Sequence, residues 1–253
     1  MFFFSTIFTN HFIYLSFKFI FTKMFYEFFE TAVTYVKGCI STIVSHTPYK
    51  DKIEKPLYFV IEHSTFFLGG YLTFWNREWL YDLSMMWDYE FEWSVYIYYY
   101  LYFVRYLVQI LHMEKTDKDY DVFLTHHLST MFLLIVSVYR FTRVGVIIAL
   151  SHDIADIFLN GAKVMNKIFE VTKDERHNML SNLLLSFFLV SWVPTRIVLN
   201  YNILSEIYIH KNLTLNVYFY DCWIDEQLAI FLLFINFGLQ LFWQVLIIRS
   251  HTT

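Results

Sequence analysis

Six apolar stretches, each about as long as a membrane-spanning helix, recur along this 253-residue chain. They lie at residues 56–75, 93–113, 121–140, 144–166, 180–202 and 227–248. About 20 apolar residues in an α-helix are enough to cross the hydrocarbon core of a bilayer. Hydrophobic residues make up 57% of the chain, and its three prolines and six glycines are too few for a loop-rich β protein. The sequence therefore predicts an all-α fold, a polytopic membrane helical bundle whose six helices form one domain over residues 56–249.

The stretch from residue 1 to 55 is expected to form a separate N-terminal segment. Residues 2–21 are apolar apart from His11 and Lys18, which is typical of a membrane anchor. A cleaved secretory signal fits poorly, because no positive residue precedes the apolar run and no small-residue cleavage site follows it. Residues 25–45 mix apolar and charged side chains, so they are expected to lie at the membrane interface or to span it. One or two N-terminal hydrophobic segments thus precede the six-helix core.

Lysine and arginine residues in the short loops predict the orientation of the bundle, because cytosolic loops are enriched in both. One side would carry Lys50, Lys52, Lys55, Lys115, Lys118, Lys167, Lys173, Arg176 and Arg249, and the other Arg77, Arg140, Arg143 and Lys211. The richer side, and with it the C-terminus, is therefore expected in the cytosol. The glycosylation sequon at residues 212–214 then falls on the lumenal side.

Net charge and cysteine content argue against two classes of protein. The formal net charge of −4 gives no reason to expect nucleic-acid binding. Cys39 and Cys222 are the only cysteines, so the chain has neither a disulfide framework nor a cysteine-based metal site.

Polar side chains recur inside the apolar stretches at the spacing of one helix face. A charged group at the centre of a spanning helix costs roughly 2.5–3.5 kcal/mol on insertion scales, so such groups usually face the protein interior. The sets are Tyr98, Tyr102, Arg105, Gln109 and His112; His126, Thr130 and Ser137; Asp153, Asp156, Asn160 and Lys163; Arg196 and Asn200; and Asn236, Gln240 and Gln244. We expect them to converge on a common interior. Interhelical hydrogen bonding alone is the simpler explanation for the last set, whereas titratable His and Asp side chains are a costly way to hold helices together.

The adjacent residues His126 and His127 allow three chemical interpretations. A metal site would use His and carboxylate ligands, but the chain has no HxxxH or HxxHH cluster of the kind that membrane di-iron enzymes need. Acyl transfer would use a neutral imidazole as nucleophile or general base, with Asp153 or Asp156 setting its tautomer. The third interpretation is a purely structural pair. Neighbouring helix residues point about 100° apart, so one histidine is expected to react while the other orients, binds or packs.

Two motifs stand out within the apolar stretches, HHLST at residues 126–130 and HDIAD at residues 152–156. They are accompanied by Asp119-Tyr120, Ala162-Lys163, Asn166, Thr195-Arg196, Leu239-Gln240, Trp243 and Ile248-Arg249. This combination resembles the ceramide synthase branch of the TLC-domain membrane proteins. HH together with HDxxD is a specific signal, although either motif alone would be weak.

The resemblance implies an endoplasmic-reticulum membrane enzyme with a six-helix TLC core. Such an enzyme joins the acyl group of a fatty acyl-CoA to the amine of a sphingoid base and forms ceramide or dihydroceramide. By motif position, His126 matches the histidine proposed to take the acyl group. The other required polar positions are matched by His127, Asp153 and Asp156. Residues 56–249 would then be a TLC-type catalytic transmembrane domain.

Further residues and partners follow from this interpretation. Polar residues expected to bind substrate, or to pair with the aspartates, are Arg105, Asn160, Lys163 and Arg196. No metal or other cofactor is expected, because acyl-CoA is itself a substrate. The partners are acyl-CoA, the sphingoid base and membrane lipid, with a homodimer, a heterodimer or a small accessory subunit left open. The alternative from another class is a non-catalytic TLC-domain membrane protein that binds, senses or moves lipids.

Overall fold

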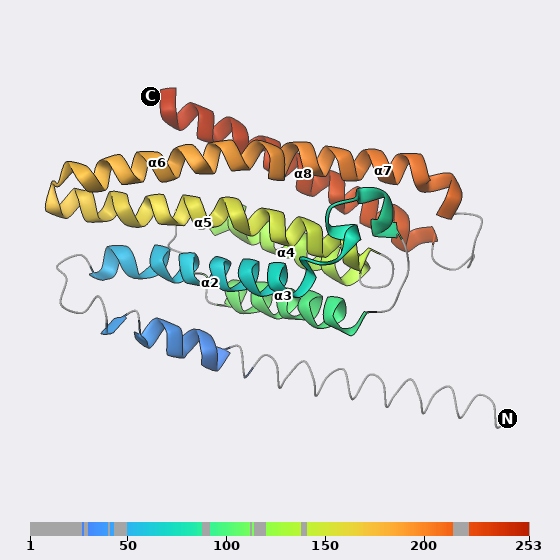
Figure 1. Ribbon diagram of the computed structural model, residues 1–253, viewed down its shortest axis with the longest axis horizontal. Coiled ribbons are helices and arrows are strands. Elements are labelled where there is room, and N and C mark those ends of the chain that lie inside the picture. The colour runs from blue at the N-terminus through green and yellow to red at the C-terminus, as the bar shows by residue number, and fades with distance from the viewer. Residues whose placement is uncertain are drawn as a thin grey trace.

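The computed structural model describes residues 27, 30–39, 41–42, 50–87, 92–111, 113, 120–137, 141–214 and 223–252. Within these residues the regular elements are all helices (Figure 1). They are α2 (Lys50–Phe74), η1 (Glu78–Leu80), η2 (Leu83–Trp87), α3 (Trp93–Leu111), α4 (Tyr120–Ser137), α5 (Thr142–Thr172), α6 (Glu175–Trp192), the π-helical turn η3 (Val193–Val198), α7 (Leu199–Thr214) and α8 (Trp223–Thr252). The predicted all-α fold class is therefore confirmed for the part of the chain that the structure describes.

One long helix comprises α6, η3 and α7, and it differs most from the sequence-based expectation. The apolar pattern predicts a helix over 180–202 and a connection that reaches residue 227. The structure instead continues the helix to Thr214, while residues 215–222 lie outside the described part. The prediction of a loop directly after residue 202 is wrong, because no proline or glycine follows there to end the helix.

Pro194 accounts for the π-helical turn within this long helix. Proline has no backbone N–H, and its ring clashes with the carbonyl oxygen four residues earlier. The wider turn of η3 accommodates both defects, and the N–H of Leu199 donates to the carbonyl oxygen of Pro194. A proline inside the apolar stretch 180–202 predicts a kink, and the structure shows this distortion as a π turn. It lies where Arg196 enters the bundle interior, with a side chain only 3% exposed.

Two helices are longer than their apolar stretches. α2 begins at Lys50, so Pro56 lies inside a helix instead of in the first turn that the sequence pattern predicts. α5 continues to Thr172. The two polar extensions meet, since Lys52 Nζ lies 3.9 Å from Glu170 Oε2. An apolar pattern identifies only the hydrophobic turns of a helix. It therefore underestimates the length of a helix whose terminal turns are polar.

A compact turn between α5 and α6 makes these two helices antiparallel. Lys173 ends α5 in the left-handed conformation, with φ of 55°. Asp174 then caps α6, because its Oδ1 accepts the backbone N–H of Arg176 at 3.0 Å. Hydrogen bonds from the side chain and backbone of Arg176 lower the pKa of Asp174 to about 2. The cap therefore stays ionised over the whole physiological pH range.

α5 is the central helix of the bundle (Figure 1). It packs against α2 on one side and α6 on the other, while α4 packs against α8. Val146 and Ala155 on α5 are fully buried. One hydrophobic cluster joins α5 to α2, α3 and η1, and a smaller one joins Ala155 to Phe188 and Trp192 of α6. Polar residues in the middle of α5 are therefore held in the bundle interior.

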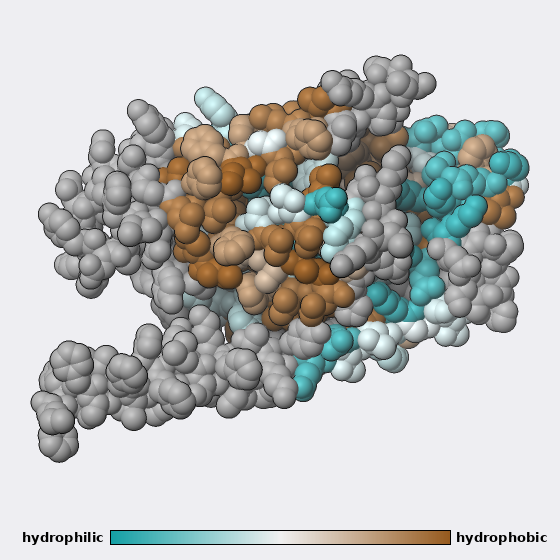
Figure 2. All heavy atoms as spheres, turned by 180° about the vertical axis from the view of Figure 1, so that it is seen from behind, coloured by the Kyte–Doolittle hydropathy of each residue, from teal (hydrophilic) through white to brown (hydrophobic). Residues whose placement is uncertain are grey.

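The outer surface of the long α6–α7 helix is apolar. Two helical stretches, Thr142–Thr172 and Glu175–Glu206, are long and apolar enough to cross a membrane by length and composition. In the second, Met179 is 70% exposed and Val190 is 73% exposed. Figure 2 shows the back of the molecule, where hydrophobic side chains cover the middle and hydrophilic ones gather toward the end of the α5–α6 turn. Exposed apolar surface of this extent is typical of a surface that contacts lipid or another protein.

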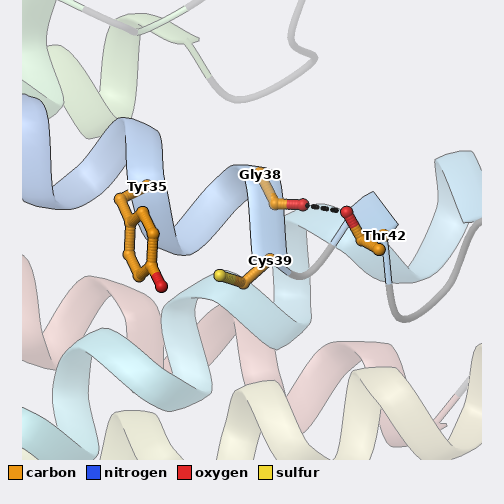
Figure 3. A pocket seen from close by; sticks show the side chains of 4 residues that line it. All are labelled: Tyr35, Gly38, Cys39 and Thr42. Carbon is orange, nitrogen blue, oxygen red and sulfur yellow. Dashed lines mark hydrogen bonds between the residues drawn. The ribbon is translucent and has the colours of Figure 1, made fainter.

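A helical segment at residues 30–39 packs beside α2. Val33 is buried in one cluster with Ile53 and Tyr58 of α2, and Lys37 Nζ lies 5.2 Å from the centre of the Tyr58 ring. A shallow depression on this segment is lined by Tyr35, Gly38, Cys39 and Thr42 (Figure 3). The predicted anchor at residues 2–21 lies outside the described part of the chain.

Two glycines allow close contact with tyrosines of α3. The Tyr98 side chain fills the space beside Gly70, and the Tyr99 side chain fills the space beside Gly145. We expect Gly145→Ala to destabilise the protein by about 1–3 kcal/mol, because the added methyl group collides with the Tyr99 ring. Gly69→Ala is the matched control, since nothing lies within 4 Å of its Cβ position. Thermal unfolding of the purified variants measures both effects, and a Gly145→Ala protein as stable as wild type would contradict this packing.

Candidate active site

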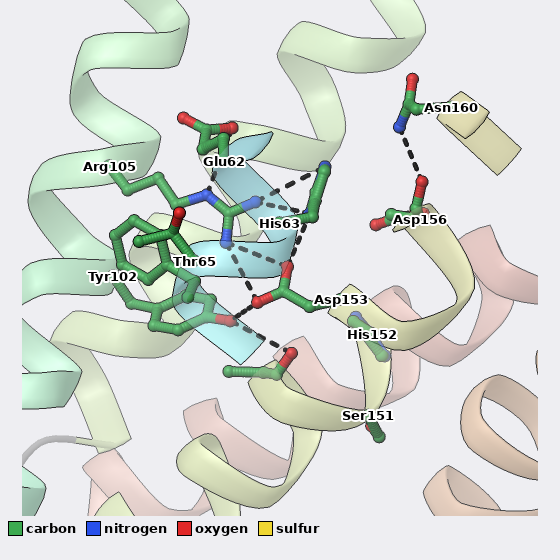
Figure 4. Close-up of polar contacts among 12 residues, drawn as sticks. Glu62, His63, Thr65, Tyr102, Arg105, Ser151, His152, Asp153, Asp156 and Asn160 are labelled. Carbon is green, nitrogen blue, oxygen red and sulfur yellow. Dashed lines mark hydrogen bonds and ion pairs between the residues drawn. The ribbon is translucent and has the colours of Figure 1, made fainter. Parts of the chain in front are cut away.

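Asp153 and Asp156 lie one turn apart on α5, but their side chains face different neighbours. Residues three apart on a helix differ by about 60° in direction. Figure 4 shows Asp153 pointing toward residues of α2 and α3, while Asp156 points away from them. Asp156 pairs instead with Arg196 in η3. The expected common interior therefore exists as two adjoining clusters, one around each aspartate.

Asp153 is held by side chains from α2 and α3 (Figure 4). Arg105 Nη1 donates to its two carboxylate oxygens at 3.0 and 3.2 Å. His63 Nδ1 lies 2.6 Å from Oδ1, and the Tyr102 hydroxyl donates to Oδ2. The Arg105 guanidinium also lies over the Phe66 ring, 4.6 Å from its centre. Because the arginine and aspartate side chains are 2% and 3% exposed, the predicted pairing of Arg105 with an aspartate is confirmed as a buried ion pair.

Glu62 on α2 adds a second carboxylate beside Arg105. Its Oε2 lies 3.5 Å from Arg105 Nε and accepts the amide of Gln109 at 2.7 Å, while its Oε1 accepts the Tyr58 hydroxyl at 2.8 Å. The amide oxygen of Gln109 in turn lies 2.9 Å from His127 Nε2. Hydrogen bonds therefore connect Glu62 to the histidine pair. We call the group Glu62, His63, Tyr102, Arg105 and Asp153 the Arg105 cluster.

Asp156 belongs to a second cluster, which joins α5, η3 and α8. Arg196 Nη2 donates to Asp156 Oδ2 at 2.8 Å and to the carbonyl oxygen of His152 at 3.0 Å. Arg196 Nη1 donates to Gln240 Oε1 at 3.3 Å, and the Gln240 amide donates to Asn236 Oδ1 at 3.2 Å. The predicted pairing of Arg196 with an aspartate is confirmed. Gln240 forms the interhelical hydrogen bond that the simpler explanation of its polar stripe expects.

His126 is the buried member of the histidine pair, 8% exposed, and its Nδ1 has no hydrogen-bond partner among the described residues. Its ring packs edge to face against Trp243 of α8, with 4.8 Å between centres, and lies 6.5 Å from Tyr106 of α3. Among the described residues, neither Asp153 nor Asp156 bonds to it, because arginines and other side chains engage their carboxylates. The prediction that one of these aspartates sets the tautomer of His126 is therefore wrong.

His126 has the environment of a reactive imidazole. Buried polar atoms are nearly always hydrogen-bonded, so an unpartnered nitrogen among aromatic rings is unusual for a purely structural histidine. His152 presents a second such atom, since its side chain is buried and its Nε2 has no partner. An imidazole nitrogen of this kind can attack a carbonyl carbon or accept a proton.

His127 differs from its neighbour in both orientation and contacts. The two rings are 5.7 Å apart, with an angle of 88° between their planes, so the expectation that they address different places is confirmed. Its Nδ1 lies 2.7 Å from the carbonyl oxygen of Phe123, and its Nε2 faces Gln109. Since both nitrogens are engaged, His127 fits the orienting or supporting role of the pair.

The two remaining candidates on α5 take other positions. Asn160 is buried, and its amide donates to the backbone carbonyl of Asp156 at 2.8 Å, so it stabilises the helix locally. Lys163 lies one turn beyond Asn160 on α5 and is exposed. His112, a member of the predicted stripe on α3, lies outside the described residues.

Sequence reasoning missed Glu62 and His63. Both are polar residues within the first apolar stretch, and Tyr58, Glu62 and Phe66 follow the spacing of one helix face. The signal that reveals the polar stripes of the other helices is therefore present in α2 as well. The partners of Glu62 and His63 come from α3 and α5, so the spacing along α2 alone does not identify them.

The carboxylates of both clusters pair with arginine: Asp156 has Arg196 to itself, whereas Asp153 and Glu62 share Arg105. Among the residues that the structure describes, no group of three or more His, Cys, Asp or Glu side chains is placed to hold a metal ion. That the reaction needs no metal or other cofactor stays a prediction.

Comparison with protein families places these clusters in a known domain. The TLC domain matches residues 52–249, a range that includes both clusters and the histidine pair. The chain belongs to the TLC domain family. Within this TLC domain, the matched range begins in the first turn of α2 and ends in the last turn of α8.

Curated relatives of this TLC domain protein are named for one activity. The chain is 31% identical over 202 residues to ceramide synthase hyl-1 of Caenorhabditis elegans, covering 72% of this chain and 52% of the relative. It is 29% identical over 149 residues to ceramide synthase LAG1 of Saccharomyces cerevisiae, covering 56% and 34%. It is 34% identical over 145 residues to the sphingosine N-acyltransferase-like protein ALT7 of Alternaria alternata, covering 54% and 32%. The chain thus spans between a third and a half of the length of these relatives, and their names confirm the resemblance to the ceramide synthase branch.

Proposed function

We propose that this TLC domain protein is a ceramide synthase, which transfers the acyl group of a fatty acyl-CoA to the amine of a sphingoid base. The observation that carries the proposal is the buried His126, whose Nδ1 is unpartnered between the aromatic rings of Trp243 and Tyr106. The relatives named ceramide synthase support the choice of substrates.

The reaction needs only one reactive imidazole. His126 attacks the carbonyl carbon of the thioester, the C–S bond breaks, and CoA leaves as a thiol with the proton from the imidazole. The sphingoid amine then attacks the acyl-imidazole, the amide C–N bond forms as the bond between the acyl carbon and the imidazole nitrogen breaks, and a proton of the amine returns to the ring. In the alternative route His126 takes the proton of the amine while the amine attacks the thioester directly. Both routes consume acyl-CoA and amine and give amide and CoA.

The polar residues around His126 have positioning roles in this proposal. Asp153 and Asp156 act by holding Arg105 and Arg196, because neither aspartate touches His126. We assign the contact with the phosphates of CoA to Lys163, whose position on α5 is exposed to solvent. Asn160 supports the helix between the two regions.

We further propose that α2, α3, α4, α5, the continuous α6–η3–α7 helix and α8 span the endoplasmic-reticulum membrane as the six-helix TLC core. The exposed apolar surface of α6–α7 supports this arrangement. Figure 1 shows the start of α2, the α5–α6 turn and the C-terminal end of α8 toward one end of the bundle. The excess of Lys and Arg at this end supports its assignment to the cytosol. The predicted anchor and interfacial segment, residues 1–55, then precedes this core, apart from residues 50–55, which belong to α2.

Cysteine labelling tests this orientation. We expect Lys173→Cys, in a protein without its native cysteines, to react with a membrane-impermeant maleimide in sealed microsomes, because the α5–α6 turn faces the cytosol. Tyr81→Cys, at the opposite end of the bundle, should react only after the membrane is permeabilised; Tyr81 is 65% exposed. The reverse pattern would contradict the proposed topology.

Release of CoA distinguishes the enzyme from the alternative lipid-binding or lipid-moving protein. Purified protein in vesicles should release free thiol from palmitoyl-CoA when sphinganine is present, and much less when the amine is omitted. Movement of a fluorescent lipid between leaflets, without amine-dependent thiol release, would instead support a protein that moves lipids.

A further inference from the structure

Gln109 has a defined orientation between Glu62 and His127. Its Nε2 lies 2.7 Å from Glu62 Oε2, and a carboxylate oxygen can only accept, so the amide nitrogen must face Glu62. The amide oxygen then faces His127 Nε2 at 2.9 Å. Because an amide oxygen carries no proton, this ring nitrogen of His127 must carry one.

The second ring nitrogen of His127 also faces an acceptor. Nδ1 lies 2.7 Å from the backbone carbonyl oxygen of Phe123, which has no proton to give. With an acceptor at each nitrogen, only a ring that carries two protons can donate both hydrogen bonds. The contacts of His63 do not define its protonation in this way. Its Nδ1 lies near both a donor, Arg105, and an acceptor, Asp153.

Charge balance in the Arg105 cluster agrees with a cationic His127. Glu62 and Asp153 are two buried carboxylates, and Arg105 is the one guanidinium between them. The neighbouring Asp156–Arg196 pair is balanced by itself. An uncompensated buried charge is costly, so one further positive charge stabilises this group, and the imidazoles near the two carboxylates that can carry it are His63 at Asp153 and His127 through Gln109.

The charged and titratable groups around His127 come from four helices. Glu62 of α2 and Asp156 of α5 attract a positive ring, whereas burial and Arg105 of α3 oppose it. Tyr106 of α3 and His126 of α4 contact the ring edge to face, at 5.2 and 5.7 Å between centres. Burial is the largest of these influences and opposes the charge, whereas the geometry favours a protonated ring, because only that ring can donate to both fixed acceptors.

We propose that Glu62 is a positioning residue that acts through Gln109 to keep His127 protonated and oriented beside the reactive His126. The inference rests on the proposed function and assigns different roles to the two histidines. His126 reacts with the acyl group, and the positive charge of His127 favours the negative charge that develops on the thioester oxygen through its electric field, because both of its N–H groups already donate to protein acceptors.

The pH profile of turnover tests this role, because a merely structural residue would not move it. Activity that needs a protonated His127 falls as pH rises and the ring loses its proton. Glu62→Gln removes the attracting charge and allows Gln109 to turn. We therefore expect the alkaline limb of the kcat profile to move by about one pH unit toward lower pH, with KM values nearly unchanged. Gln109→Met, which breaks the connection without removing a charge, should move the limb in the same direction.

Tyr58→Phe is the matched control. It removes the other hydrogen bond to Glu62 and leaves the connection through Gln109 in place. Its alkaline limb should stay at the wild-type position. If the alkaline limb of Tyr58→Phe moved as far as that of Glu62→Gln, the shift would come from any structural change around Glu62. That result would overturn the inference.

Deuterium exchange at the imidazole C2 position, read by mass spectrometry for each histidine, tests the same inference without any activity. The pH midpoint of exchange at His127 should be lower in Glu62→Gln and Gln109→Met than in wild type. An active wild-type enzyme whose limb and midpoint are unchanged in both variants would overturn this inference and leave the proposed function intact. A wild-type protein that forms no ceramide would overturn the proposed function, while the midpoint would still decide the protonation of His127.

Discussion

Replacement of His126 with alanine should reduce ceramide formation by about 10³-fold or more while the protein still folds. The variant loses the only imidazole of the pair with an unpartnered buried nitrogen, and a positioned base or nucleophile contributes roughly 10²–10⁴-fold or more to such reactions. Turnover of acyl-CoA and sphinganine by purified protein measures the loss. Size-exclusion chromatography and the unfolding temperature show whether the variant is folded.

His177→Ala provides the control for this experiment. His177 lies near the start of α6, and its Nδ1 is 3.3 Å from the hydroxyl of Thr172. Thr172 is the last residue of α5, whereas the two aspartates lie in the middle of that helix. Replacement of His177 should leave turnover near wild type. If His126→Ala also retained activity near wild type, the reactive group would have to be sought elsewhere, and the unpartnered Nε2 of His152 would be the next candidate.

Replacement of Arg105 with methionine should destabilise the protein by roughly 3–5 kcal/mol, the range measured when one partner of a buried ion pair is removed. Methionine preserves much of the side-chain volume but leaves Asp153 and Glu62 buried without their shared cation. Adding Asp153→Asn should recover part of the lost stability, because it removes one of the two uncompensated charges. Thermal and denaturant unfolding in detergent measure both variants.

An exposed ion pair serves as the comparison for Arg105. Arg176 pairs with Asp174 at 2.7 Å, but its side chain is 86% exposed. Arg176→Met should therefore leave the unfolding temperature nearly unchanged. Equal effects of Arg105→Met and Arg176→Met would mean that the Arg105 cluster does not hold α2, α3 and α5 together.

The helices of this bundle could be predicted from apolar stretches, but their ends could not. The first stretch begins at residue 56 and its helix at Lys50, because the added turns are polar and meet the polar end of α5. The fifth stretch ends near residue 202, whereas the helix continues to Thr214. Apolar length reports the part of a helix that avoids water, while the hydrogen bonds that define the helix continue into polar turns.

The members of the site could be predicted better than their partners. The spacing of Asp153 and Asp156 indicates one face of α5, and the arginines expected to pair with them do so. Which groups meet depends on the rotation of α5 and on the helices beside it. Asp153 therefore contacts His63, which the predicted site did not include, instead of His126. The contacts between side chains depend on how the helices pack together, and the residue spacing along one helix does not predict this packing.

The most direct test of the central claim is the formation of ceramide from an isotopically labelled acyl-CoA and sphinganine by purified protein in lipid vesicles. Mass spectrometry should detect labelled dihydroceramide in amounts that match the released CoA for wild type, and only a trace for His126→Ala. Absence of labelled product from a folded wild-type protein, or equal amounts from the two proteins, would contradict the assignment of acyl transfer to this histidine.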